Sequence, residues 1–405
     1  MKNRIATETG GISMKNRIGA LLTVSLGLLA LANAQHSFVH LRSYTLADLF
    51  DGSANGIGSN IGDVAFDGTN LYVAGYHTAT GGSQVVGMAR ISNFYTGGSF
   101  VASNTSLTPA WKVQLRQAGG SRDTRLVYYN GALYLGTGLG DNTQTGTGIR
   151  KYDTNGTLDT SWAGDGLLSL SEAGINRYDT MELDPGYSGS GPTLAVGIFG
   201  STRILRFNLA TGDNAGNTQP VSGTPTSIRD IAFAPNGDMY YKYNGLTGQM
   251  AGVRRFERTA ATTFMDGGNF ATFTEGGLQQ STVAYVPVSQ VYANLGDLVL
   301  HNVRVSGMNQ VFVRALDGSE VTTLTGGGPT ADDFTPPSSY TNTLLNFSSF
   351  VTPEGRVFIF VVQGGGGAGT YRNRLDIYEV VPEPASMLAL GTGLVSLLAL
   401  RRRKR

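Results

Sequence analysis

The chain has 405 residues and no cysteine, and its 30 Lys and Arg against 29 Asp and Glu leave a formal net charge of +1. The lack of cysteine excludes disulfides, thiolate catalysis and Cys-based metal sites. Four of the cations precede Gln35 and five follow Val381, whereas Glu8 and Glu383 are the only acidic residues outside this range. Residues 35–381 therefore carry a net charge near −6. Such a body disfavours nucleic acid as a partner, because phosphate binding needs clustered cations.

The first segment has the pattern of a secretory signal peptide. The sequence MKNRI occurs at both Met1 and Met14, and we take Met14 as the true start. Two cations and an apolar run follow, and then the triplet Ala32-Asn33-Ala34, an A-x-A cleavage signal. Residues 1–34 are therefore expected to be removed on export, which leaves a mature chain that begins near Gln35.

Residues 35–381 repeat one unit of sequence. Each copy joins an apolar strand to an aromatic-rich strand through a turn, as in DVAFDGTNLYVAGY from residue 63. Further extended stretches follow, for example GIRKYDTNG and GVRRFERT. Four strands per 50–60 residues is typical of a β-propeller blade. The copies start at Asp63, Asp123, Asp179, Asp230, Ser281 and Asn342.

The sequence therefore predicts an all-β protein with a single β-propeller of six four-stranded blades over residues 35–381. HSFVHLRSYTL (36–46) has strand character, and we expect it to complete the last blade, because mixing strands from the two ends protects sheet edges. Seven blades is the alternative, since residues 46–61 and the long fifth repeat leave room for another sheet.

The second repeat resembles a known propeller repeat. Residues 148–170, GIRKYDTNGTLDTSWAGDGLLSL, are similar to the delta-60 repeat, and residues 73–92 are similar to part of it. The resemblance implies a propeller and implies little about activity. The residues that carry it are Arg150, Tyr152, Gly156, Leu158, Asp159, Ser161, Trp162, Gly164 and Gly166.

The body shows no established catalytic motif. It has no H-E-x-x-H, and GYSGSG (186–191) fails the spacing of a serine nucleophile elbow. The loops LGDNTQTGTG (139–148) and DGGNF (266–270) have a calcium-binding composition without the D-x-D-x-D-G spacing. We interpret both as hairpin loops and predict a non-enzymatic protein without a cofactor, calcium being the one ion that such loops would suit.

Aspartates at repeated positions suggest a ligand site. Asp63, Asp123, Asp179 and Asp230 each open the first strand of a repeat, and Arg122 and Arg229 precede two of them. The innermost strands of a propeller line its central channel, so these side chains are expected to form a ring at one mouth. Such a ring can hold a cation or bind sugar hydroxyls. The alternative is that each aspartate caps the backbone of an incoming loop.

The last segment, residues 382–405, has three parts in a fixed order. Pro382, Glu383 and Pro384 precede an apolar run over 387–400, and a basic end follows with Arg401, Arg402, Arg403, Lys404 and Arg405. This order resembles the PEP-CTERM sorting segment of bacterial exported proteins. The run would span about 21 Å as a helix, less than a hydrocarbon core of about 30 Å. We therefore expect transient insertion in the inner membrane, with the cations on the cytoplasmic side.

The resemblance implies an exosortase-type enzyme that cuts near the motif and releases the body outward. A plain single-pass anchor is the alternative. We expect a monomer that is exported by the general secretory route to the cell surface or beyond. It would serve as a binding or structural module for an extracellular polysaccharide, linked to biofilm, or for a surface protein. The alternative is an extracellular glycan lyase, hydrolase or lactonase that uses carboxylates at the channel mouth.

Overall fold

The computed structural model describes fourteen stretches of the chain: residues 35–46, 60–78, 84–102, 107–117, 124–137, 148–169, 178–198, 202–218, 228–243, 251–273, 282–305, 308–324, 344–364 and 374–383. The predicted signal peptide (1–34), Pro384, the apolar run and the basic end (401–405) lie outside these residues. Within the described stretches no helix is long and apolar enough to cross a membrane.

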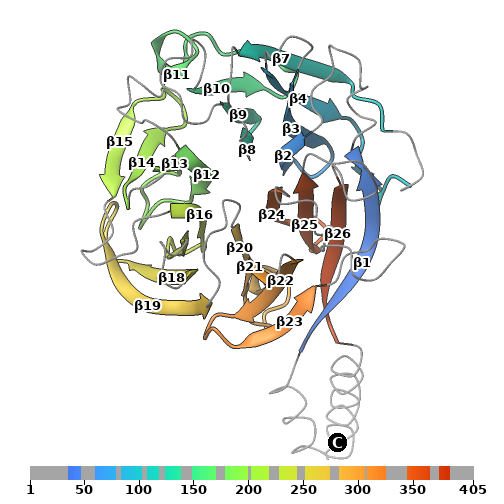
Figure 1. The fold of residues 1–405 in the computed structure, drawn as a ribbon, viewed down its shortest axis with the longest axis vertical. Helices are drawn as coiled ribbons and strands as arrows, with labels where there is room; N and C mark the ends of the chain where they lie inside the picture. The colour runs from blue at the N-terminus through green and yellow to red at the C-terminus, as the bar shows by residue number, and fades with distance from the viewer. Residues whose placement is uncertain are drawn as a thin grey trace, which may run out of the picture. The chain divides into compact units, whose positions relative to one another are not determined.

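The chain divides into two compact units. The smaller contains both ends of the chain and Tyr292–Leu295, and in it the N–H of Glu383 donates to the carbonyl of Gln35 at 3.0 Å. The larger contains Phe38–Val291 and Gly296–Val380. Its described strands form six four-stranded sheets around a central axis (Figure 1), which confirms the predicted six-bladed propeller.

The first three blades are made of consecutive strands, with one inserted hairpin. Blade 1 consists, from the axis outward, of β2 (Asn60–Phe66), β3 (Leu71–Thr78), β4 (Gln84–Ile91) and β7 (Trp111–Gln117), and β5 (Tyr95–Thr96) and β6 (Ser99–Phe100) form the hairpin. Blade 2 consists of β8 (Thr124–Tyr129), β9 (Ala132–Thr137), β10 (Gly148–Asp153) and β11 (Leu168–Ser169). Blade 3 consists of β12 (Tyr178–Asp184), β13 (Thr193–Ile198), β14 (Ile204–Asn208) and β15 (Asn214–Thr218).

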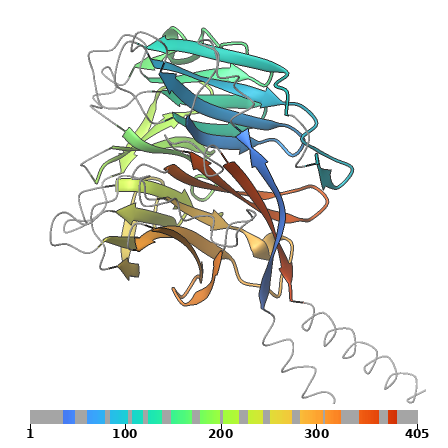
Figure 2. The same ribbon diagram turned by 45° about the vertical axis from the view of Figure 1, so that its right-hand side comes forward.

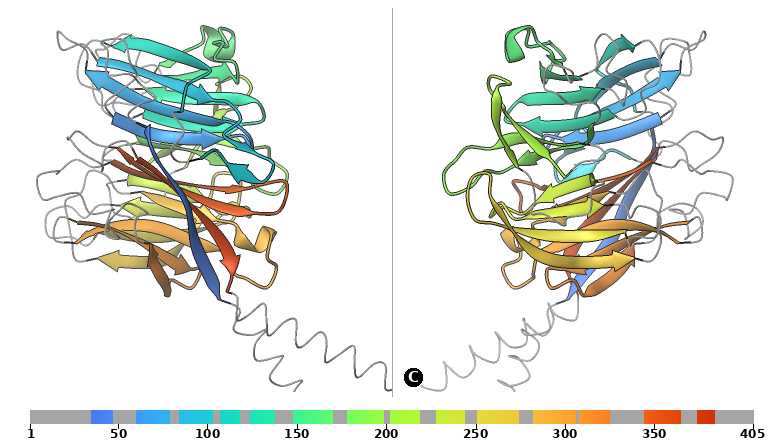
Figure 3. Two further views of the ribbon diagram at one scale, coloured as in Figure 1. Left: turned by 90° about the vertical axis from the view of Figure 1, so that its right-hand side faces the viewer. Right: turned by 60° about the vertical axis from the view of Figure 1, so that its left-hand side comes forward.

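Blades 4 and 5 are also made of consecutive strands, whereas the last blade combines strands from the two ends of the chain. Blade 4 consists of β16 (Ile228–Phe233), β17 (Met239–Tyr243), β18 (Ala251–Arg258) and β19 (Phe264–Phe273). Blade 5 consists of β20 (Val283–Val286), β21 (Leu298–Val305), β22 (Met308–Ala315) and β23 (Glu320–Leu324). Blade 6 consists of β24 (Leu344–Val351), β25 (Val357–Gly364), β26 (Arg374–Pro382) and β1 (His36–Thr45). Figures 2 and 3 show β1 running beside β26, as the sequence predicted.

Apolar side chains on both faces of each sheet form the core between neighbouring blades. At the interface of blades 6 and 1, Phe66, Phe100, Phe358 and Phe360 are all buried, and the rings of Phe100 and Phe358 lie 4.9 Å apart. Comparable clusters fill the interfaces of blades 1 and 2, 2 and 3, 3 and 4, and 4 and 5. This arrangement explains the repeated aromatic residues of the sequence, because each sheet must bury both faces.

Local turn chemistry sets the strand pairing within a blade. Asn130 and Gly131, with φ of 46° and 82°, form the two-residue turn between β8 and β9. Positive φ at both positions is what a type I′ hairpin turn requires, and Asn-Gly is its preferred sequence.

One loop prediction is wrong. Residues 266–270 were expected to form a hairpin loop, but they lie inside β19, where the pairing with β18 shifts register. Asp266 forms an ion pair with Arg254 and accepts the N–H of Gly268, whose φ is +86°. The glycines therefore form a bulge in an outer strand, a use of Gly-rich sequence that resembles a loop in composition.

Charged side chains of blade 6 form contacts with blade 1 and with the first strand of the fold. Arg356 donates to both carboxylate oxygens of Glu379, at 2.7 and 2.6 Å, and also to the carbonyl of Gly98 and the hydroxyl of Tyr95 in blade 1. In blade 6, Asp376 of β26 accepts hydrogen bonds from Arg374 and from Ser43 of β1. The contacts of Arg356 join blade 6 to blade 1, and the contact of Asp376 with Ser43 joins β26 to β1.

Candidate functional site

The inner strands β2, β8, β12, β16, β20 and β24 surround the axis, and each contacts the inner strands of both neighbouring blades. Three of them carry one extra residue near their start, where the pairing with the second strand shifts. The extra residues are Gly62, Asp179 and Arg229, and the residues that follow them are Asp63, Thr180 and Asp230.

Register and hydrogen bonds identify the same position in all six blades. Asp63, Thr180 and Asp230 face Ala74, Gly197 and Lys242 of their second strands, and Arg125 faces Gly136 in the same way. The N–H of Val283 donates to Asp230 as the N–H of Leu126 donates to Asp63, which aligns Thr282 with Arg125. Asn346 accepts the N–H of the residue that follows it, as Asp63 does. We call these residues the axial position: Asp63, Arg125, Thr180, Asp230, Thr282 and Asn346.

Asp63 links blade 1 to blade 2. It is buried, with 5% of its surface exposed. Its Oδ1 accepts the N–H of Val64 at 2.7 Å, and its Oδ2 accepts the N–H of Leu126 in β8 at 2.8 Å. Both oxygens therefore satisfy backbone donors, one of them in the next inner strand.

Asp230 links three blades. Its Oδ1 accepts the hydroxyl of Thr180 in blade 3 at 2.5 Å. Its Oδ2 accepts the hydroxyl of Thr282 at 2.7 Å and the N–H of Val283 at 3.0 Å, both in blade 5. The bond to Val283 repeats the geometry of Asp63 with Leu126, so two blades use the same connection.

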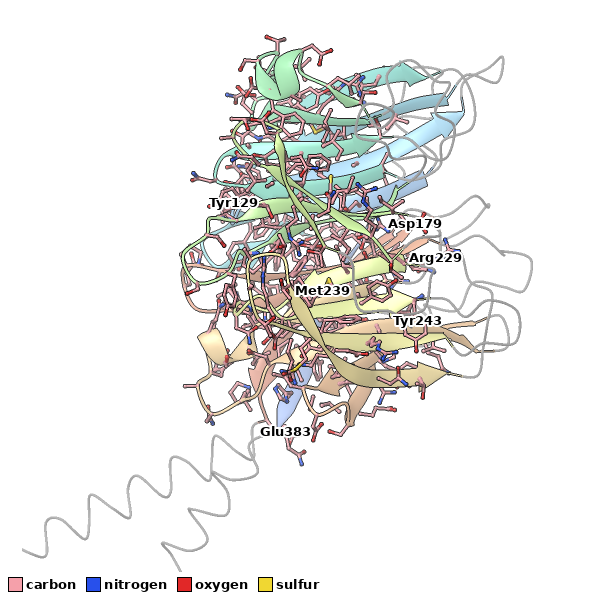
Figure 4. The ribbon with its side chains drawn as sticks, turned by 90° about the vertical axis from the view of Figure 1, so that its left-hand side faces the viewer. Tyr129, Asp179, Arg229, Met239, Tyr243 and Glu383 are labelled. Carbon is pink, nitrogen blue, oxygen red and sulfur yellow. The ribbon has the colours of Figure 1, made fainter. Side chains whose placement is uncertain are left out.

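Asp179 lies one residue before the axial position, at the extra residue of β12. Its Oδ2 accepts Arg229 Nη1 at 2.6 Å, and its backbone carbonyl accepts Arg125 Nε and Nη2 at 3.1 and 2.9 Å. Asp179 thus binds a cation from each neighbouring blade. Figure 4 shows Asp179 and Arg229 toward one end of the strands and Tyr129 toward the other.

The structure thus shifts parts of the predicted aspartate ring. Asp63 and Asp230 occupy the axial position, whereas Asp179 is displaced from it by one residue. Asp123, Ser281 and Asn342 lie outside the described residues, and their blades have Arg125, Thr282 and Asn346 at the axial position. Asp179 is displaced because it is itself the extra residue of β12, whereas in β2 and β16 the extra residues are Gly62 and Arg229 and the aspartate follows them.

A cavity of about 460 Å³ lies on the axis and is lined by the inner strands of all six blades. This volume is within the range of small-molecule sites. The cavity lining changes along each strand. It starts with axial residues such as Asp63, Arg125 and Asp230, and three residues later it contains Phe66, Tyr128, Phe233 and Tyr285. At about 3.3 Å per residue, the charged and aromatic ends are roughly 10 Å apart.

Glu182 lies between these two ends, and the sequence analysis did not identify it. Two residues after the axial position, the other blades carry small or apolar side chains: Ala65, Val127, Ala232, Ala284 and Ser348. Glu182 is half-buried and lines the cavity. Its Oε1 accepts the N–H of Leu183 at 3.2 Å, and among the described residues its other oxygen has no hydrogen-bond partner. The signal in the sequence is a glutamate between the apolar residues Met181 and Leu183, at a place where the other repeats have small or apolar residues.

Burial changes the protonation of the charged residues near the axis. It raises the pKa of Glu182 to about 8, and the nearby charges of Asp230 and Asp63 act in the same direction. Burial also raises the pKa of Asp63 to about 7, against the opposing charge of Arg125. It lowers the pKa of Lys242 to about 7; this lysine donates to the carbonyl of Asn302 at 2.6 Å. Burial therefore favours the neutral forms of Glu182 and Asp63 near neutral pH.

A second group of residues has the composition of a catalytic triad. His40 Nε2 lies 3.0 Å from Ser43 Oγ and 3.4 Å from Asp376 Oδ1. The hydroxyl of Ser43, however, donates to Asp376 at 2.5 Å, and Arg374 donates to the same oxygen at 2.8 Å. A triad needs the serine proton directed to histidine and the acid on the other ring nitrogen. This group instead joins β1 to β26.

Metal ligation receives no support from the described part of the chain, where no group of three or more His, Asp and Glu is arranged to hold a metal ion. His301 is buried, stacks on Phe312 and accepts a hydrogen bond from Arg314 at 2.8 Å. Burial and the charges of Lys242 and Arg314 hold its pKa well below the ordinary value. His301 is thus a neutral residue of the core.

Comparisons with known proteins identify the C-terminal segment. Residues 380–404 match the PEP-CTERM protein-sorting motif, so the segment predicted from Pro382, Glu383 and Pro384 is confirmed as a sorting motif. No curated protein matches the chain. The resemblance of residues 148–170 to the delta-60 repeat remains a prediction.

The fold is similar to several solved structures at low sequence identity. The β-propeller domain of Cps50 (Swd1) from Myceliophteria thermophila is 11% identical, with 80% of this chain and 99% of that chain covered and a TM-score of 0.37. The tail fibre of Staphylococcus aureus phage P68 is 10% identical, with 90% and 56% covered and a TM-score of 0.36. Hydrazine synthase of Kuenenia stuttgartiensis is 10% identical, with 63% and 60% covered and a TM-score of 0.34. At these TM-scores none of them bears on function.

Proposed function

We propose that this protein is a non-enzymatic binding module, displayed at or released from the bacterial cell surface, with its ligand site in the axial cavity. The PEP-CTERM motif over residues 380–404 marks an exported protein that an exosortase-type enzyme sorts to the cell envelope or surface. The fold is a six-bladed propeller. The cavity supports binding, because all six blades line it and Glu182 places a carboxyl group in it.

The extracellular polymer of the cell surface, or a protein within it, is the environment in which this module would work. The net charge near −6 of residues 35–381 makes an acidic polymer or nucleic acid a poor partner. We expect the signal peptide to be removed near Gln35 and the sorting motif to be cut near Pro382–Pro384, with the apolar run in the inner membrane only during sorting.

Sorting can be tested in cells with two variants, Glu383→Gln and a deletion of residues 401–405. We expect both variants to remain in the membrane fraction while the wild type reaches the surface, because each change damages the sorting segment. The propeller should still fold, since the motif and the basic end are separate from it. Glu354→Gln, an exposed change in a turn of blade 6, is the control. If both variants reached the surface as the wild type does, the proposed route would be wrong.

A second candidate is an extracellular glycosidase or lactonase, and Glu182 is the observation that favours it. A carboxyl group that stays protonated near neutral pH, close to other carboxylates, is what a general acid in glycoside hydrolysis requires. The exported protein distinguishes the two functions: release of reducing ends from surface polysaccharide would support the enzyme, and binding without turnover would support the module.

A further inference from the structure

The axial cavity offers a ligand few polar contacts. Asp63 and Asp230 line it, but each of their carboxylate oxygens already accepts a hydrogen bond from another blade or from the adjacent backbone. Arg125 donates to the carbonyl of Asp179. Glu182 differs from these residues because one of its oxygens has no partner among the described residues.

The charges that line the cavity are unequal. Three carboxyl groups, those of Asp63, Glu182 and Asp230, share the lining with one guanidinium, that of Arg125. An anionic ligand would find one guanidinium, which already donates to the carbonyl of Asp179, whereas an ammonium group placed at Glu182 would favour the ionised form of that carboxyl group. Burial is the main cause of the raised pKa of Glu182, and the nearby charges of Asp230 and Asp63 add to it.

Most of the rest of the lining is apolar, and its polar members are Gln290, Asn346, Ser348 and Ser349, of which the two serines donate to backbone carbonyls. Beyond Glu182 the wall contains aromatic rings and three prolines: Phe66, Tyr128, Phe233, Tyr285, Phe350, Pro185, Pro235 and Pro287. Aromatic rings attract ammonium groups and cover apolar surfaces equally well. A ligand with many hydroxyl groups would leave most of them without partners, and an unpaired buried hydroxyl is costly.

From these three features we infer that the axial cavity binds an organic cation, a single ammonium group carried by an apolar or aromatic body, with the ammonium at Glu182 and the body against the aromatic end. This inference rests on the proposed binding function and names the chemical class of its ligand. The ammonium would donate to the carboxylate of Glu182, which stands where the other blades carry Ala65, Val127, Ala232, Ala284 and Ser348.

Calorimetric titration of the purified exported protein tests the inference with three probes of one shape: phenethylamine, 2-phenylethanol and phenylacetate. We expect phenethylamine to bind at least about tenfold more tightly than 2-phenylethanol, on the scale of a hydrogen bond to a charged group. Phenylacetate should show no binding. Equal binding of the amine and the alcohol would overturn the inference, and this comparison needs no variant.

The role of Glu182 has its own readouts. Glu182→Gln should reduce phenethylamine affinity at least about tenfold, whereas Glu354→Gln should leave it unchanged. Glu182 is the group that must lose a proton when the ammonium binds, with Asp63, Arg125 and Asp230 as the charges around it. Titrations at pH 7 in two buffers of different ionisation enthalpy should show release of nearly one proton by the wild type and almost none by Glu182→Gln. Unchanged affinity and proton release in that variant would refute the role.

The nature of the body that carries the amine is tested by a further comparison with glucosamine oligomers and with uncharged cello-oligosaccharides. Tighter binding of phenethylamine than of the glucosamine oligomers would support the apolar or aromatic body, and the reverse order would overturn it. Binding of the uncharged oligosaccharides alone would overturn the inference and leave the proposed binding function intact. Failure of surface localisation, measured separately in cells, would overturn the proposed function itself.

Discussion

Asp63 in β2 accepts the backbone N–H of Leu126 in β8 at 2.8 Å, so a carboxylate of one blade satisfies the inner strand of the next. Asp230 in blade 4 makes the same bond to Val283 in blade 5, at 3.0 Å. In a propeller each inner strand has an edge toward the channel, where backbone groups lack a neighbouring strand. An axial carboxylate supplies the missing acceptor from the adjacent blade.

The inter-blade bonds of Asp230 predict a clear loss of stability for Asp230→Asn. The amide nitrogen would place a donor where the carboxylate now accepts two hydroxyls and one N–H. Loss of buried hydrogen bonds of this kind costs about 1–3 kcal/mol. Urea unfolding of the exported protein measures the change, with Glu354→Gln as a control expected within about 0.5 kcal/mol of the wild type.

The same variant separates a structural from a ligand-binding role of the aspartates. Asp230 lines the cavity but uses its oxygens within the protein, so we expect the affinity for phenethylamine to change less in Asp230→Asn than in Glu182→Gln. A stable Asp230→Asn that no longer bound any ligand would contradict this assignment and restore the predicted aspartate ring as the binding site.

The raised pKa of Glu182 predicts an unusual pH dependence of folding. Between its ordinary pKa of 4.5 and about 8 the folded protein keeps a proton on Glu182 that the unfolded chain has released. Asp63 likewise keeps its proton in the folded protein between pH 3.8 and about pH 7. The folded state therefore binds more protons, and the free energy of unfolding should fall as pH rises from about 4 to 8.

The slope should reverse at higher pH because of Lys242. Its pKa is lowered from 10.5 to about 7, so above pH 7 the unfolded chain holds the extra proton and stability rises with pH. Melting curves from pH 4 to 10 should show a minimum between about 7 and 8. In Glu182→Gln the fall toward pH 8 should be shallower, and an unchanged curve would mean that Glu182 titrates normally.

Sequence periodicity was sufficient to predict the architecture. Every sheet is buried between two blades, so the same apolar and aromatic pattern recurs in every repeat. The aromatic residues of β2, β9 and β25 and the strand from His36 indicated six blades and their closure. The extra residues Gly62, Asp179 and Arg229 left no such trace, since a one-residue bulge changes which side chain faces the axis without changing the alternation visible in sequence.

Contacts between distant parts of the chain were equally beyond the sequence. Glu182 becomes important only because other blades carry small side chains at its position, which requires the strands to be aligned in space. Ser43 and Asp376 are 333 residues apart, and their meeting depends on β1 completing blade 6. Interpreting 266–270 as a loop failed because glycine and aspartate serve a bulge and a turn equally well.

The closure of blade 6 leads to a paired prediction for Asp376 and Ser43. Asp376 is fully buried and accepts Arg374 at 2.8 and 3.0 Å, together with Ser43. Asp376→Ala leaves the buried guanidinium of Arg374 without its carboxylate, which costs about 3–5 kcal/mol in comparable sites. Ser43→Ala removes one hydroxyl and leaves the ion pair, so it should cost only about 0.5–1.5 kcal/mol. Urea unfolding of the two variants measures the difference, and because a serine nucleophile would make Ser43 indispensable to any esterase activity, such activity in the wild type that vanished in Ser43→Ala would contradict the structural role assigned here.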